Sequence, residues 1–314
     1  MDFISLLSLI LMGFFVGILS GFFGFGGGFI LTPFLISLGF PTNISVGTSI
    51  TEIFMSSIVS SLRHKRLGNV NIKIGLIVAF TSIFSAEIGA QIIEYLKNLS
   101  IYQLNIIINL IYVIVLGLIS LGMAYDSLRS KRTKNFKGNF SHRHFNKLEK
   151  SETESNASPP DWALALIGFI GGFFAGFLGA GGGFLLVPLL IYIIKCEHHI
   201  AAGTCNFVFL LSCAYASFTH FFKGNIDFIS AALLLSGSII GSQIGALATR
   251  QVKGAIFKAA FSSCLGSVSI SIALKLISIL FDIFFLNLLS QLVIFSAVSS
   301  IAILILILFY VQIT

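Results

Sequence analysis

Two glycine clusters have the composition and the setting of an anion-binding site. Gly24–Gly28 reads GFGGG and Gly179–Gly183 reads GAGGG, and each cluster lies between two strongly apolar runs. Consecutive glycines break a helix and adopt backbone angles that are closed to other residues. A helix that starts after such a break presents unpaired amides and a partial positive charge. We therefore predict that backbone amides bind an anion at Gly26, Gly27, Gly28, Gly181, Gly182 and Gly183.

Close helix packing through small residues is the alternative explanation for these glycines. A single GxxxG pattern would favour packing, whereas two matched breaks, each before a short apolar segment, favour a substrate site. A nucleotide-binding loop is disfavoured, because the spacing is not GxGxxG and the flanking runs are membrane spans.

Small polar residues follow each glycine cluster at the start of the next apolar segment. Residues 47–49 read GTS and residues 203–206 read GTCN. Hydroxyl and amide groups donate hydrogen bonds to oxyanions, but they bond equally well to their own backbone or to a neighbouring helix. Because their positions match in the two halves of the chain, we predict that Thr48, Ser49, Thr204 and Asn206 line the substrate site.

Two acidic residues, Glu52 and Glu87, lie inside apolar segments. A carboxylate at membrane depth is costly and is a functional candidate by default, often for proton transfer. Neither acid is repeated in the second half, where Val208 and Gln243 stand at the matching positions. Glu52 and Glu87 are therefore candidates for coupling transport to an ion, and pairing with a basic residue is the alternative.

Two histidines, His64 and His220, occupy matching positions four residues before a Gly-Asn pair. No cluster of Cys, Asp or Glu accompanies them in the sequence, so we expect no metal site and interpret both as caps of helix carboxyl ends. The sequence has no GxSxG or HExxH motif, and we predict no catalytic residue and no cofactor. An intramembrane enzyme that uses His64, His220 and Glu52 stays open as a less favoured alternative.

The composition identifies the environment of these groups. The 314 residues are 56% hydrophobic and 10% charged, with a mean hydropathy of +1.00, whereas a soluble domain carries about a quarter charged residues. Runs of about 20 apolar residues recur along the chain and predict a polytopic helical membrane protein. Much of the net charge of +7 lies between Arg129 and Lys150. This segment is predicted to be a cytoplasmic loop and not a nucleic-acid-binding face.

The apolar segments predict an all-α bundle of about 8–10 transmembrane helices. Phe29–Gly39 and Phe184–Ile194 are exceptions, because eleven residues reach about 16 Å, half the hydrocarbon core. Both are expected to be half-helices. The first segment, Ile4–Phe22, follows no basic region and precedes no cleavage motif, so we expect a retained helix.

The chain is an internal duplication. Residues 13–33 and 168–188 share 12 of 21 positions at an offset of 155, and after one inserted residue the match resumes at 156. Matching positions include glycine, proline, histidine and asparagine, which apolar composition alone does not align. The predicted organisation is a first transmembrane repeat at 1–125, a charged cytoplasmic linker at 126–161 and a second repeat at 162–314.

The distribution of charge predicts that the two repeats are inverted. Basic residues flank the loop after Arg63–Arg66 in the first repeat, but in the second they cluster at Arg250–Lys258, after a different helix. Basic loops prefer the cytoplasmic side. Both clusters and the linker reach that side together only if the repeats have opposite orientations.

The two motifs GILSGFFGFGGGFILTP and GFFAGFLGAGGGFLLVP, followed by GTS and GTCN, resemble the sulfite exporter TauE/SafE family of membrane transporters, also called TSUP. The resemblance extends through H-x-x-x-G-N and the Ile-Gly-Ala stretches and covers nearly the whole chain outside the linker. It implies an integral inner-membrane protein that moves small sulfur anions such as sulfite, sulfonates or thiosulfate. Some relatives are linked to small carboxylates.

These observations predict a secondary transporter of small anions of the sulfite, thiosulfate or sulfoacetate type, which works by alternating access. The expected partners are the anion, the lipid bilayer and, as an open possibility, further copies of the chain; no nucleic acid is expected. An anion channel built from the same amides, or a membrane scaffold without a substrate, is an alternative.

Overall fold

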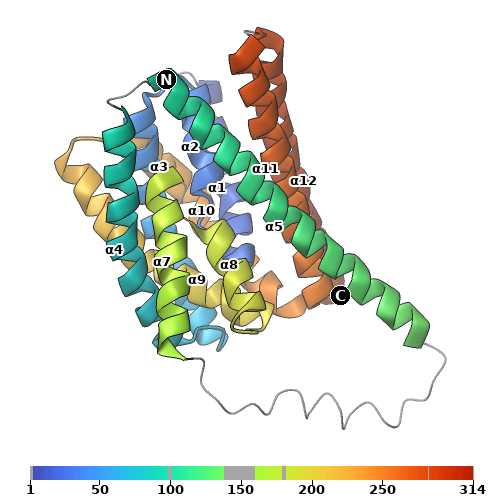
Figure 1. Cartoon of the computed structure of the whole chain (residues 1–314). Helices are drawn as coiled ribbons and strands as arrows, with labels where there is room; N and C mark the ends of the chain where they lie inside the picture. The colour runs from blue at the N-terminus through green and yellow to red at the C-terminus, as the bar shows by residue number, and fades with distance from the viewer. Residues whose placement is uncertain (1–2, 98–100, 138–159, 179–181, 282, 314) are drawn as a thin grey trace.

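The computed structural model describes residues 3–97, 101–137, 160–178, 182–281 and 283–313, and all regular elements in these ranges are α-helices (Figure 1). The helices of the first repeat are α1 (Phe3–Phe23), α2 (Gly28–Ser37), α3 (Thr42–Arg66), α4 (Ile72–Lys97) and α5 (Ile101–Lys137). They are followed by α7 (Asp161–Leu178), α8 (Gly183–Tyr192), α9 (His198–Phe222), α10 (Phe228–Gln251), α11 (Gly254–Phe281) and α12 (Phe284–Ile313). Seven of the described helices have the length and hydropathy to cross a membrane. The chain is therefore an all-α, multi-pass membrane protein, as predicted.

The two short helices predicted from the sequence are present as α2 and α8. Each has 10 residues, which span about 15 Å, half the thickness of the hydrocarbon core. The residue before each helix is a glycine in the left-handed region, Gly27 with φ of 86° and Gly182 with φ of 63°. The glycines are therefore needed for the sharp turn that separates each half-helix from the preceding long helix.

The predicted linker begins later in the structure than the composition suggested. Helix α5 continues to Lys137, and α7 begins at Asp161. Lysine and arginine are good helix formers, so the basic residues after 126 prolong an apolar helix that is already present. The rest of the predicted linker, 138–159, lies outside the described residues.

The two repeats are interlocked. Helix α1 packs along α10, and its repeat mate α7 packs along α4, so the first helix of each repeat is embedded in the other repeat. The matching helices α3 and α9 pack on each other, as do α5 and α11, and α12 follows as an additional helix. In Figure 1, α1 starts at the end of the bundle where the amino terminus lies, and α7 starts at the opposite end. The repeats thus run in opposite directions, as the charge distribution predicted.

Glycines allow the interlocked helices to approach closely. A β-carbon on Gly176 of α7 would lie 1.9 Å from the carbonyl oxygen of Ala86 in α4, and one on Gly241 of α10 would lie 2.2 Å from that of Phe14 in α1. Small residues at such spacings are typical of tightly packed membrane helices. The packing explanation therefore holds for the glycines of these long helices. Gly27 and Gly182 in the breaks combine close packing with positive φ.

The basic segments meet at one end of the bundle, called the basic end below. The Nη1 atom of Arg250, at the end of α10, donates to the carbonyl oxygen of Leu67, just after α3, at 3.5 Å. Near the start of α11, Lys258 pairs with Asp126 of α5 at 2.8 Å. The α3–α4 loop, the α10–α11 connection and the last part of α5 therefore share one face of the bundle.

Replacing Gly241 by alanine should destabilise the protein, because the new methyl group meets backbone of α1 that side-chain rotation cannot move. We expect a loss of about 1–3 kcal/mol or more, the usual cost of overpacking, seen as a lower melting temperature in detergent. Gly122→Ala is the matched control, because a β-carbon at Gly122 meets nothing within 4 Å. Equal melting temperatures for the two variants would contradict this description of the α1–α10 contact.

Candidate functional site

The two glycine breaks meet inside the protein. A β-carbon on Gly183, at the start of α8, would lie 2.5 Å from the Cα atom of Phe25 in the first break. The rings of Phe29 and Phe184, matching residues in the first turns of α2 and α8, have centroids 6.0 Å apart, and both side chains are buried. The amino ends of the two half-helices therefore converge on one buried region. Of the predicted glycines, Gly181 lies outside the described residues.

The first amides of each half-helix are unpaired with other backbone. In α2 the amides of Ile30 and Leu31 donate to the carbonyl of Gly27, and in α8 those of Leu185 and Leu186 donate to the carbonyl of Gly182. The amides of the two residues that start each half-helix find no backbone acceptor in the described ranges. Together with the dipoles of α2 and α8, these amides give the region the electrostatics of an anion site.

Helices α3 and α9 flank the breaks. A β-carbon on Gly26 would lie 3.2 Å from Cγ2 of Ile53 on α3 and 3.6 Å from the ring of Phe209 on α9. Because α3 and α9 are matching helices that pack on each other, their contact and the two breaks lie together where the repeats are related by pseudo-two-fold symmetry.

Three residues predicted from the sequence lie within one helical turn of these contacts and keep spare polar atoms. Ser49 and Glu52 on α3 and Asn206 on α9 are buried. The Ser49 hydroxyl, Oε2 of Glu52 and Oδ1 of Asn206 have no hydrogen-bond partner among the described residues. Buried polar atoms without partners are uncommon in folded proteins. Buried polar atoms that are available for further hydrogen bonds therefore lie near the breaks.

The two predicted threonines lie elsewhere, at opposite ends of the bundle. The Thr48 hydroxyl accepts a hydrogen bond from the amide of Asp227 at 3.0 Å, and the Thr204 hydroxyl accepts one from the amide of Asn71 at 3.1 Å. Asp227 and Asn71 are themselves matching residues, just before α10 and α4. Each threonine therefore ties one repeat to the other, and the structure does not bring the two into a single site.

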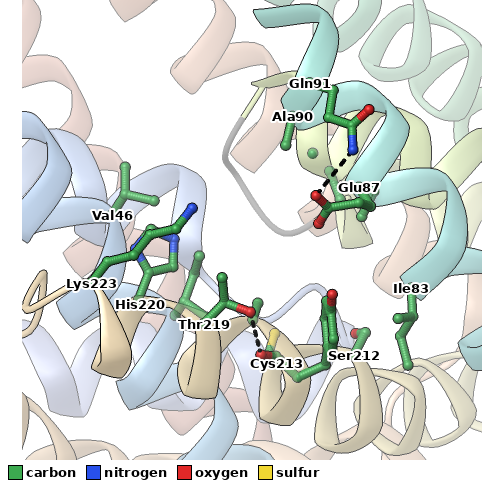
Figure 2. A pocket seen from close by; sticks show the side chains of 16 residues that line it. Val46, Ile83, Glu87, Ala90, Gln91, Ser212, Cys213, Thr219, His220 and Lys223 are labelled. Atoms are coloured by element: carbon green, nitrogen blue, oxygen red, sulfur yellow. Dashed lines mark hydrogen bonds between the residues drawn. The ribbon is translucent and has the colours of Figure 1, made fainter. Parts of the chain in front are cut away.

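The second predicted acid, Glu87, lines a cavity of about 230 Å³ between α4, α7, α3 and α9, and Glu52 is not among its lining residues. Figure 2 shows Glu87 and Gln91 of α4 facing His220 of α9 and Lys223, which follows α9, across this cavity. Oε1 of Glu87 accepts from Nε2 of Gln91 at 3.4 Å. Lys223 was not predicted from the sequence. The available signal was its difference from the matching residue of the first repeat, Leu67, which is uncharged.

The residues of the enzyme alternative are not gathered in one place. His64 is buried near the basic end, where its Nε2 atom lies 2.8 Å from the carbonyl oxygen of Gly21. His220 lines the cavity at the other end. The inverted repeats thus place the two histidines toward opposite ends of the bundle.

Comparisons with known proteins agree with this architecture. Residues 9–272 match the family model described as Sulfite exporter TauE/SafE. The chain is 30% identical over 285 residues to a protein of Methanocaldococcus jannaschii named probable membrane transporter protein MJ0441, covering 84% of this chain and 94% of that one. It is 26% identical over 262 residues to the probable membrane transporter protein YunE of Bacillus subtilis, covering 79% and 90%. No solved structure matches the chain. With its duplicated glycine breaks and a family match across most of its length, the chain belongs to the sulfite exporter TauE/SafE family of membrane transporters.

Proposed function

We propose that the chain is a secondary transporter of small anions, with sulfur oxyanions and organosulfonates such as sulfite, thiosulfate and sulfoacetate as its substrate class. The observation that carries this proposal is the convergence of the amino ends of α2 and α8, with their unpaired amides, in one buried region between the repeats. The family description names sulfite as an exported substrate, which supports the sulfur oxyanion over other small anions.

The binding region would hold an anion through neutral donors. The amides at the two half-helix starts and the Ser49 hydroxyl supply hydrogen bonds, and the helix dipoles supply positive potential. Nδ2 of Asn206 donates to the carbonyls of Ser20 and Ala202, at 3.4 and 3.2 Å. Asn206 therefore fixes the wall between α1 and α9 that encloses the region. A site of neutral donors binds without the desolvation cost of a buried lysine or arginine.

The inverted repeats support alternating access as the transport mechanism. In transporters of this construction, one repeat moves against the other around a site near the middle of the bilayer. Movement of the substrate would be driven by ion, proton or substrate gradients. We place the protein in a bacterial inner membrane with the basic end and the linker in the cytoplasm, because basic segments favour that side.

Glu52 is the residue we assign to proton coupling. Its side chain is buried, and it takes part in none of the ion pairs formed by the described residues. Its neighbours Ser56 and Ser238 are neutral. A buried carboxyl without a partner cation needs a proton, and a bound anion nearby raises that need. Binding of the anion and of a proton would therefore favour each other.

Binding is tested first by the melting temperature of purified protein with sulfite, thiosulfate, sulfoacetate, taurine or acetate. A true ligand at a hundredfold excess over its Kd should stabilise the protein by about 2.7 kcal/mol. Ser49→Ala should leave the ligand-free melting temperature unchanged, because the hydroxyl has no hydrogen-bond partner in the described part of the chain. It should weaken binding roughly tenfold or more, the value of one hydrogen bond to a charged group.

Ser45→Ala is the control for this experiment, because the Ser45 hydroxyl already donates to the carbonyl of Pro41 at 3.0 Å. It should leave the anion affinity unchanged. A folded protein that no anion stabilises, or equal binding by the two serine variants, would contradict the proposed site. Flux in liposomes that does not saturate with anion concentration would indicate a channel.

Glu52→Gln should abolish the stimulation of transport by a pH gradient in liposomes, because glutamine carries no transferable proton. The anion should still raise the melting temperature of this variant. Glu197→Gln, at an exposed position just before α9, should keep the wild-type response to pH. Normal stimulation in Glu52→Gln would remove Glu52 from the coupling mechanism.

A further inference from the structure

The two matching histidines, His64 and His220, differ in the hydrogen bonds of their rings and in the burial of the residues around them. Both lie near the carboxyl ends of matching helices, α3 and α9, and each is followed by a loop with the same Gly-Asn pair. In both loops the asparagine amide donates to the histidine carbonyl, at 2.9 and 3.0 Å. Because the local backbone is the same, the difference between the two histidines lies in what their rings contact.

His64 joins α3 to α1 at the basic end. Its Nε2 atom lies 2.8 Å from the carbonyl oxygen of Gly21, and its Nδ1 atom lies 3.3 Å from Nδ2 of Asn69. Gly21 is in the last turn of α1, where carbonyl groups have no partner within their own helix. The histidine thus caps the end of α1, and not that of its own helix. Thr249 of α10 adds a hydrogen bond to the carbonyl of Phe22 at 2.9 Å.

His220 makes no such contact. Its Nδ1 atom is buried without a partner, and no hydrogen bond of its ring is found among the described residues. Gly176, which matches Gly21, lines the same cavity from the last part of α7. Asn225, which matches Asn69, instead accepts a hydrogen bond from Asn43 at 2.8 Å. The hydrogen bond that joins α3 to α1 therefore has no equivalent between α9 and α7 among the described residues.

Burial follows the same asymmetry. Of the residues that line the cavity, Cys213 alone is buried, and the others are half-buried or exposed. Most of the matching positions at the basic end are buried. They include Ser20, Ser56, Ser57, Ser60, Asn206 and Ser242, which match Ala175, Ser212, Cys213, Ala216, Ile50 and Ala86 of the cavity. The bundle is thus open toward the end with His220 and closed at the end with His64.

We infer that His64 and His220 are alternating closing residues of the transport cycle. In the state described here, the hydrogen bond from His64 to Gly21 closes the basic end. In the opposite state, His220 bonds to the carbonyl of Gly176 and closes the cavity, while His64 releases Gly21. This inference rests on the alternating access in the proposed function. It assigns to the histidines a positioning role that involves neither substrate nor metal.

The exchange is balanced, because one hydrogen bond to a helix-end carbonyl forms as the other breaks. The two states would otherwise differ in the number of buried unpaired groups, which are costly in a membrane. Removing one histidine should therefore shift the population by roughly 2- to 12-fold, the range expected for one neutral hydrogen bond. The sign of the shift depends on which histidine is removed.

Accessibility of single cysteines tests the inference without substrate. In a variant that lacks the four native cysteines, Ala216→Cys reports on the cavity, and Ser60→Cys, its repeat mate, reports on the closed end. A membrane-impermeant thiol reagent should label the cysteine at 216 from the face opposite the basic end and leave the one at 60 largely unlabelled. Adding His64→Ala should raise labelling at 60 from the basic face by roughly 2- to 12-fold and lower labelling at 216.

His220→Ala is the matched control and should leave the cysteine at 60 protected. His64→Gln, which retains a donor for the carbonyl of Gly21, should keep most of the protection. Folding of each variant is checked by gel filtration. A folded His64→Ala protein with an unlabelled cysteine at 60 would overturn the inference, as would equal labelling in the two alanine variants. If labelling alternates as expected but no anion is transported, the proposed function fails and the closing role of the histidines stands.

Discussion

The structure depends on one constraint, that backbone amides and carbonyls at membrane depth need partners. Two breaks in the helical backbone leave such groups at the starts of α2 and α8 without a backbone partner among the described residues. They are tolerable only because protein surrounds them on every side, and the interlocking of the repeats supplies that surrounding. Helices α3 and α9 cross beside the breaks, and the rings of Phe25, Phe29 and Phe184 are buried between them and the rest of the bundle. The unpaired amides are thereby kept from lipid and left to each other and to a ligand.

Glycine serves two physical purposes in this fold: close packing in the long helices, and packing together with unusual backbone angles in the breaks. In the long helices, Gly176 and Gly241 are helical and let two backbones touch, so their value lies in the missing side chain. In the breaks, Gly27 and Gly182 have positive φ, so they supply conformational freedom in addition to space. Sequence spacing distinguishes the two settings: glycines four residues apart pack inside helices, whereas each run of three glycines stands at a break. Gly21, in the last turn of α1, packs against Ser242 of α10, and its carbonyl oxygen contacts the His64 ring.

The sequence predicted what local chemistry controls. The half-length of α2 and α8 followed from the length of their apolar runs, and the inverted arrangement followed from where Arg63–Arg66 and Arg250–Lys258 fall. The sequence did not predict the partners of Thr48 and Thr204, because the amides of Asp227 and Asn71 reach them only through the interlocking of distant segments. Nor could it reveal that His64 is bonded and His220 is not, since the two share the same local pattern. That difference depends on how α1 and α7 are placed against α3 and α9, which the local sequence around each histidine does not specify.

The embedding of α1 in the second repeat also bears on how such a chain could be synthesised and how it could arise. During synthesis, the glycine face of α1 has no partner until α10 is made, more than two hundred residues later. The hydrogen bond between Thr249 and Phe22 is an example of a contact formed across this separation. Until then the first repeat must sit in the bilayer with that face against lipid or against another chain. A polypeptide with a single repeat would form the same contacts only by dimerising with a copy inserted into the membrane in the opposite orientation. The fused chain contains both orientations in one molecule, so neither depends on encountering a partner.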